Sequence, residues 1–101
     1  DVPHGLVCAV LLPPVLEFNY PVCEGRFGAL AGRMGLTSGL EVVPSIQDLA
    51  QRVGIPSSFR EFGLREEHLP YILANCRTGS MRSNPREATD EDLLRLLRQL
   101  M

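Results

Sequence analysis

Two histidines are the side chains in this sequence best suited to acid–base chemistry or to holding a metal ion. His4 stands before Gly5 at the start of an apolar segment, where an imidazole can reach a cleft while the backbone begins a helix. His68 follows two glutamates on a polar stretch, a setting typical of a solvated histidine. Because one imidazole is not a metal site, position alone favours a capping or surface role for His4 too.

A second candidate is the polar loop from Arg77 to Arg86. Arg77, Arg82 and Arg86 are interleaved there with threonine, serine and asparagine, and guanidinium groups of this kind can hold a phosphate or a carboxylate. The sequence has no GxxxxGK phosphate loop and no dinucleotide fingerprint. It also has no paired-carboxylate, Ser-His-Asp or Cys-His arrangement of convincing spacing. We therefore favour a solvated loop between two helices, with an anion site near Cys76 to Arg86 as the alternative.

The cysteines and the charge exclude several other classes of protein. Cys8, Cys23 and Cys76 are an odd number without a CxxC pair, which disfavours a disulfide scaffold or a zinc knuckle. Each is interpreted as a small buried hydrophobic residue. The net charge of −2 gives no broad attraction for nucleic acid or for an anionic membrane. No apolar stretch approaches the roughly 20 residues of a membrane span, so we expect a cytoplasmic protein with no membrane partner.

Length and composition predict one folded domain over residues 1–101. Hydrophobic residues make up 45% of the chain and charged residues 22%, close to the average for soluble globular proteins. A chain of 101 residues can bury only one modest hydrophobic core. Numbering opens at Asp1 without an initiator methionine, and a strongly apolar segment follows within five residues. We interpret the chain as cut from a longer protein.

Helices are expected to position these side chains. The segment from His4 to Tyr20 is apolar on every side through Leu12, which predicts a helix surrounded by protein. Pro13 and Pro14 are expected to bend or interrupt that helix. Because no alternating strand pattern is present, the sequence predicts an all-α, bundle-like domain of about five helices. The further helices are expected over 24–34, from 40 or 45 to 53, over 66–76, and from Thr89 to the end.

The three- and four-residue spacing of apolar side chains predicts which face of each helix points inward. Thr89 and Asp92 additionally predict a capping box at the start of the last helix. The expected inward residues are Phe27, Leu30, Ala31 and Met34 in the second helix; Ile46, Leu49, Ala50 and Val53 in the third; Leu69, Ile72, Leu73 and Cys76 in the fourth; and Leu93, Leu94, Leu96, Leu97, Leu100 and Met101 in the last.

Three segments resemble a known family, the iron-containing (group III) alcohol dehydrogenases. VPHGLVCAVLLPPVLEFN resembles the family segment in which Pro-His-Gly opens a long helix of the carboxy-terminal domain. LAQRVGIPSSFREFGLREEHLP is similar to the family's helix, Gly-Ile-Pro turn and Glu-Glu helix. SNPREATDEDLLRLLRQL is similar to its Asn-Pro-Arg loop and closing helix. The likeness covers essentially the whole chain and is weakest from Thr37 to Val43.

This resemblance implies part of an NAD(P)-dependent alcohol and aldehyde oxidoreductase. In the family one Asp and three His hold ferrous iron, or sometimes zinc, in a helical domain. The histidine of Pro-His-Gly is the last of these ligands, so the resemblance makes His4 a metal ligand and overturns the interpretation from position alone. The other ligands and the nucleotide-binding domain lie upstream in the family. The resemblance therefore assigns no catalytic or cofactor-binding residue here, and implies a chain that binds neither cofactor stably and is inactive alone.

An alternative hypothesis is a helical interaction module descended from such an enzyme. It would bind a protein partner, or a second copy of itself, through exposed apolar faces. The segment from Leu6 to Leu12 would then lie in the interface. A monodisperse monomer that covers this segment with its own chain would count against the alternative.

Overall fold

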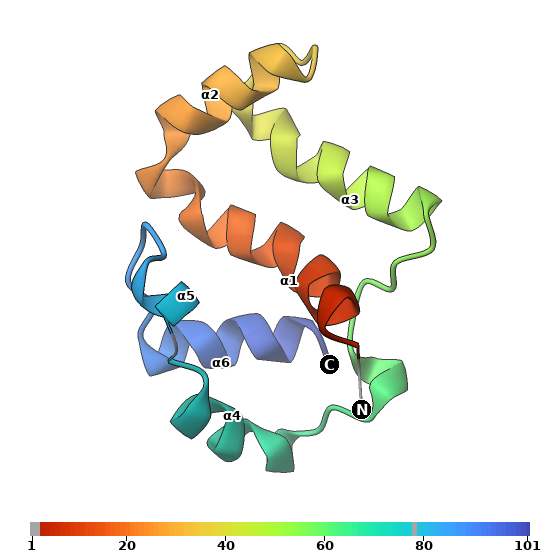
Figure 1. Ribbon diagram of the computed structural model, residues 1–101, viewed down its shortest axis with the longest axis vertical. Coiled ribbons are helices and arrows are strands. Elements are labelled where there is room, and N and C mark those ends of the chain that lie inside the picture. The colour runs from red at the N-terminus through yellow and green to blue at the C-terminus, as the bar shows by residue number, and fades with distance from the viewer. Residues whose placement is uncertain (1–2, 78) are drawn as a thin grey trace. The chain divides into compact units, whose positions relative to one another are not determined.

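The computed structural model describes residues 3–77 and 79–101, and every regular element within these ranges is helical (Figure 1). Because the described residues contain no strand, the all-α prediction is confirmed, and the five longer α-helices match the expected number. The α-helices are α1 His4–Asn19, α2 Glu24–Arg33, α3 Val42–Arg52, α4 Leu69–Asn75, the four-residue α5 Gly79–Arg82, and α6 Asp90–Gln99. Short 3-10 turns are η1 Tyr20–Val22, η2 Gly39–Glu41, η3 Arg60–Phe62 and η4 Glu66–His68.

The helices form two compact units, residues 1–57 and residues 58–101. The first unit contains α1, α2 and α3, and the second contains α4, α5 and α6. Each unit buries apolar side chains of its own, so the two are described separately. A single domain spanning residues 1–101 stays a prediction.

The core of the first unit is built around Phe27 of α2. Its ring meets the ring of Tyr20 edge-on, with centroids 5.1 Å apart and planes at 88°, an arrangement that aromatic quadrupoles favour. The buried members of this core are Cys23, Phe27, Ala31, Val42 and Val43, with Leu16, Tyr20, Leu36 and Ile46 packed against them. Through these contacts α2 and α3 pack together, and α3 also packs on α1 (Figure 1).

The turn η2 approaches α2 so closely that a side chain at its first residue would crowd α2. A Cβ atom at Gly39 would lie 3.0 Å from the Gly28 nitrogen and 3.1 Å from the Phe27 Cβ atom. A capping box fixes the turn, since Leu40 N–H donates to Ser38 Oγ at 3.2 Å and Ser38 N–H donates to Glu41 Oε2 at 3.1 Å. Close approach and capping together bring α3 onto α2.

The inward faces predicted for the second and third helices are only partly covered. Phe27 and Ala31 are buried as predicted. The other half of each prediction is wrong, because Leu30, Met34, Leu49 and Val53 are exposed. Spacing identifies residues that share a face, but burial also requires another element to cover that face, and here α2 and α3 are covered along only part of it.

The helix α1 runs through both prolines, so of the two expected outcomes, a bend or an interruption, the interruption does not occur. Pro13 and Pro14 lie inside a continuous helix from His4 to Asn19. Each lacks an N–H group, so the carbonyls of Ala9 and Val10 lose their donors four residues ahead. The backbone hydrogen bonds before and after the two prolines keep the segment helical.

The helix α1 continued by η1 is also longer and more apolar than we expected. The span His4–Val22 has 19 residues and a mean hydropathy of 1.4, which meets the length and composition of a membrane span. The expectation that no stretch approaches that length is therefore wrong. Length and composition are met equally by helices in the core of soluble proteins. Within this chain little of the span is buried, although Val10 and Pro13 are.

The second unit packs α4 against α6. Its buried residues are Phe59, Leu69, Ala88, Leu93 and Leu100. The Phe59 N–H donates to the Leu100 carbonyl at 2.6 Å and ties the start of the unit to the end of α6. The predicted capping box is confirmed, since Asp92 N–H donates to Thr89 Oγ1 at 3.1 Å and Thr89 N–H donates to Asp92 Oδ2 at 3.0 Å.

Across the second unit, an ion pair joins the start of η4 to the last turn of α6. Arg98 Nε and Nη2 donate to the two oxygens of Glu66 at 3.0 and 3.1 Å. These hydrogen bonds lower the pKa of Glu66 and raise that of Arg98. The pair joins the chain just before α4 to the end of α6.

Truncating the central aromatic side chain of the first unit should destabilise the protein strongly. Phe27→Ala removes a side chain that is 6% exposed and leaves a cavity, so we expect a loss of about 3–5 kcal/mol in the free energy of unfolding. Urea unfolding followed by circular dichroism measures it. Leu30→Ala, on the same helix but 43% exposed, is the control and should change stability by only about 0.5 kcal/mol. Equal losses in the two variants would contradict the described core.

The Glu41 carboxylate should make the first unit less stable in acid. The Thr37 N–H at 2.8 Å, the Thr37 hydroxyl at 3.0 Å and the Ser38 N–H lower the pKa of Glu41 below its ordinary 4.5. A lowered folded pKa means that the stabilisation is complete above pH 4.5 and is lost as pH falls through the folded value.

Urea midpoints measured from pH 7 down to pH 3 check this dependence. Glu41→Gln should lower the midpoint at pH 7 and flatten its fall below pH 4.5. Glu17→Gln removes the same charge from an exposed position on α1 and serves as the control. Parallel curves for the Glu41→Gln variant and the unsubstituted protein would show that the capping carboxylate contributes nothing.

Candidate metal-ligand site on α1

His4 is the first residue of α1, and Pro3 directs the chain into the helix. Pro3 is extended, with φ −56° and ψ 140°, and its carbonyl accepts from the N–H groups of Leu6 and Val7 at 3.1 Å each. Proline cannot donate a hydrogen bond, and the start of a helix is where a missing donor costs least. His4 consequently sits on the first helical turn with an exposed side chain.

The imidazole of His4 contacts the thiol of Cys8. His4 Nε2 lies 3.5 Å from Cys8 Sγ, and both residues are exposed. Their separation of four residues places them on one face of α1, one turn apart. The interpretation of Cys8 as a buried residue is therefore wrong, because the described residues leave Cys8 exposed.

The described residues supply a fitting ligand for a divalent metal but not a complete site. Neutral imidazole is a usual ligand of iron and zinc, and the His4 ring is accessible. Within residues 3–77 and 79–101, no group of three or more His, Cys, Asp or Glu side chains is arranged to hold a metal ion. His4 can therefore fill one coordination position, and further donors have to come from elsewhere.

The second histidine performs a local structural task. His68 is exposed, as expected, and its Nδ1 atom accepts the Arg65 N–H at 3.0 Å, which caps η4. Its Nε2 atom lies 3.9 Å from Glu67 Oε1. Nothing in this arrangement indicates a ligand site.

The arginine loop is organised by contacts within the chain. Arg77 Nη1 donates to the Ala88 carbonyl at 2.9 Å, and Nη2 donates to Asp90 Oδ1 at 2.7 Å, a contact that raises the pKa of Arg77. The guanidinium therefore holds the start of α6 rather than presenting its donors to an anion. Residues 79–82 form the short helix α5 inside the expected loop, and Thr78 lies outside the described residues.

The other cysteines follow the sequence interpretation more closely. Cys23 is buried in the core of the first unit as a small hydrophobic residue. Cys76 is half-buried, and its Sγ atom lies 3.9 Å from the Leu73 carbonyl. The sequence interpretation missed the contact of Cys8 with His4, although the four-residue spacing of these two residues is visible in the sequence.

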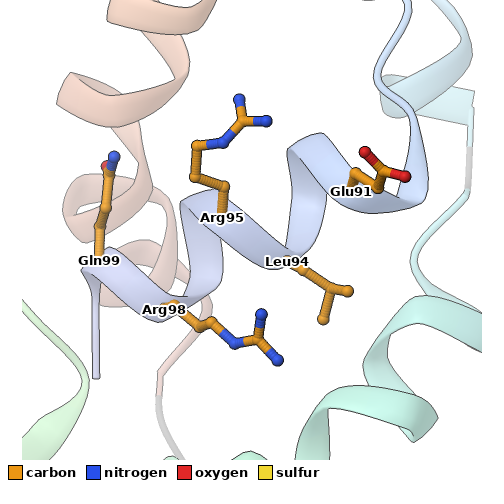
Figure 2. Close-up of a pocket in the computed structure, with 5 residues that line it drawn as sticks. All are labelled: Glu91, Leu94, Arg95, Arg98 and Gln99. Carbon is orange, nitrogen blue, oxygen red and sulfur yellow. The ribbon is translucent and has the colours of Figure 1, made fainter.

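A hollow beside α6 is distinct from this ligand face. It is lined by Glu91, Leu94, Arg95, Arg98 and Gln99, all from α6 (Figure 2). Arg95 and Arg98 leave the helix in different directions in this view, and Arg98 is already paired with Glu66. The lining contains neither histidine nor cysteine, so the hollow offers no metal-binding chemistry comparable to that of His4.

The helical fold and the Pro-His-Gly start of α1 agree with the carboxy-terminal domain expected from the resemblance. The family model described as "Fe-containing alcohol dehydrogenase family, C-terminal" matches residues 1–101. The chain therefore belongs to the iron-containing alcohol dehydrogenase family and corresponds to its carboxy-terminal part.

Individual relatives agree with this family assignment. The chain is 31% identical to a 4-hydroxybutyrate dehydrogenase of Cupriavidus necator, with 97% of this chain and 27% of that protein covered. It is 33% identical to the lactaldehyde reductase of Escherichia coli, with 95% and 28% covered. A crystal structure of a 1,3-propanediol oxidoreductase superposes with a TM-score of 0.90 at 30% identity, covering 100% of this chain and 29% of that one. The chain thus spans between a quarter and a third of these relatives.

Proposed function

We propose that the chain is the metal-side helical part of a metal-dependent and NAD(P)-dependent alcohol dehydrogenase. The observation that carries this proposal is the position of His4, an accessible imidazole on the first turn of α1 in a chain that belongs to the family. The names of its relatives support alcohol and aldehyde chemistry, and one of them is an NAD-dependent methanol dehydrogenase. Their substrates differ, so no particular alcohol is assigned.

In this proposal His4 supplies one ligand to ferrous iron or zinc. A divalent metal with an open position polarises a carbonyl or alkoxide oxygen for hydride transfer with a nicotinamide. The role of this chain is to present the imidazole from a rigid helix start, with Pro3 fixing where α1 begins. The remaining metal ligands and the nucleotide-binding domain lie upstream in the longer protein, and the nucleotide-binding domain is the partner of this chain. We further propose a cytoplasmic location, with no nucleic-acid or membrane partner.

The chain should have no dehydrogenase activity by itself. With NADH or NADPH, an aldehyde, and either Fe²⁺ or Zn²⁺, oxidation of the nicotinamide at 340 nm should not exceed the rate without protein, because one ligand cannot hold a catalytic metal. Metal-dependent reduction of an aldehyde by the 101-residue chain would overturn the claim that it is incomplete.

The DNA upstream of Asp1 tests whether the chain is part of a longer enzyme. A continuous reading frame encoding a dinucleotide-binding domain and further His and Asp ligands is the expected result, and a stop codon directly upstream would contradict it. If the longer protein is active, His4→Gln should lower kcat/KM by about a hundredfold or more, since a metal ligand is lost. Variant His68→Gln should retain activity, because His68 is exposed and caps only a local turn.

A second candidate function is that of a helical interaction module. The observation that favours it is α1, which is apolar on every side yet little buried within the chain. An apolar helix of this length that is only partly covered favours association with protein. In a complete enzyme the amino-terminal domain would cover α1, whereas in the isolated chain a second copy is the available cover.

The isolated chain should therefore self-associate through α1. Light scattering after size-exclusion chromatography at micromolar concentration should give more than the monomer mass of 11.2 kDa. Leu12→Lys places a charge on an exposed apolar position of α1, and should shift the population toward monomer. Leu40→Lys, more exposed and located on η2, is the matched control and should leave the mass unchanged. A monodisperse monomer at every concentration would contradict association.

A further inference from the structure

One apolar cluster joins the three α-helices of the first unit. Phe27 of α2 is buried in it together with Val42 and Val43 of α3. Leu16 of α1 packs against the same cluster. Because each helix covers apolar side chains of the others, removing one helix would expose the rest of the cluster to water. The first unit should therefore open as a whole rather than helix by helix.

The second unit is closed by contacts between its own beginning and its own end. The Phe59 N–H donates to the Leu100 carbonyl at 2.6 Å. Arg98 donates to both carboxylate oxygens of Glu66 at 3.0 and 3.1 Å. Between these contacts α4 packs against α6, and Leu69 at the start of α4 is buried. These interactions all lie within residues 58–101, so they can form together and be lost together.

The segment between the two units stops the helix before it. Gly54 adopts the left-handed conformation with φ 83°, and the Ile55 N–H donates to the Ala50 carbonyl at 2.9 Å, an arrangement that ends α3. Pro56 then has no N–H group with which to continue a helix. Residues 53–59 belong to no helix. Helix formation in one unit therefore does not propagate along the backbone into the other.

We propose that the chain opens as two separate cooperative units, residues 1–57 and residues 58–101. The second unit opens more readily, because it is the shorter one and is closed in part by an ion pair between exposed groups. The inference goes beyond the proposed function and does not depend on it. Its consequence for the candidate site is that α1, and with it the helix start at His4, stays folded when the second unit opens.

Amide hydrogen exchange of the full 101-residue chain tests this proposal. Exchange is measured by mass spectrometry of peptides at increasing urea concentrations below the unfolding midpoint. The slowest amides of α2 and α3 should converge on one opening free energy, and those of α4 and α6 on a second, lower value. A single value shared by the slowest amides of all four helices would overturn the proposal, and this measurement needs no substitution.

Two core variants show whether each unit opens without the other. Phe27→Leu should speed exchange in α2 and α3 by about tenfold and leave exchange in α4 and α6 within about twofold. Leu69→Val should have the reverse effect, because Leu69 is buried in the second unit. Leu30→Ala and Tyr71→Ala are the matched controls, since they remove exposed side chains from the same two units. Exchange in the controls should stay within about threefold throughout.

The pattern of acceleration decides between two units and one. Faster exchange confined to the substituted unit supports separate opening, because the two cores then contribute independently to stability. Equal acceleration of all four helices by either core variant would show one cooperative core and overturn the proposal. The proposed function is decided separately, by the upstream reading frame and the activity of the longer protein.

Discussion

The structure depends on a helix, α1, whose sides are all apolar. Exposing the apolar surface of such a helix to water is unfavourable, so other elements have to pack around it. The chain supplies some of that cover, since α3 packs on α1 and Val10 and Pro13 are buried. Most other residues of α1 are only partly covered within the described residues. Much of the first unit follows from this constraint: the tight turn at Gly39 brings α3 back over α2, and the Phe27 core fixes the pair.

Local signals in the sequence predicted local structure well. Thr89 and Asp92 predicted a capping box that needs only a three-residue contact, and the two hydrogen bonds are present. The helix start at His4 also followed from neighbouring residues, because Pro3 sets the entry of the chain. Burial could not be predicted in the same way. Leu49 and Val53 have the spacing of an inward face, yet they are exposed, because burial depends on an element that covers them.

The same contrast between local and non-local information applies to the candidate site. Composition and position gave no reason to choose His4 over an ordinary surface histidine, and only the resemblance of the Pro-His-Gly segment made it a candidate ligand. Its contact with Cys8 was within reach of the sequence, since residues four apart on a helix meet. The assumption that free cysteines are buried concealed it. In the arginine loop the contacts of Arg77 with Ala88 and Asp90 weaken the anion-site alternative, which the sequence had already ranked below a solvated loop.

The position of the ligand and the cover of α1 are linked, because one helix carries both. His4 and Cys8 are on its first turns, and the apolar surface continues along the same backbone as far as Leu16. Whatever packs against that surface also sets the direction from which further ligands can reach the imidazole. In the proposed enzyme, covering α1 and completing the metal site are therefore one structural event. A catalytic site needs the donors that arrive with that cover, because one imidazole cannot hold a catalytic metal.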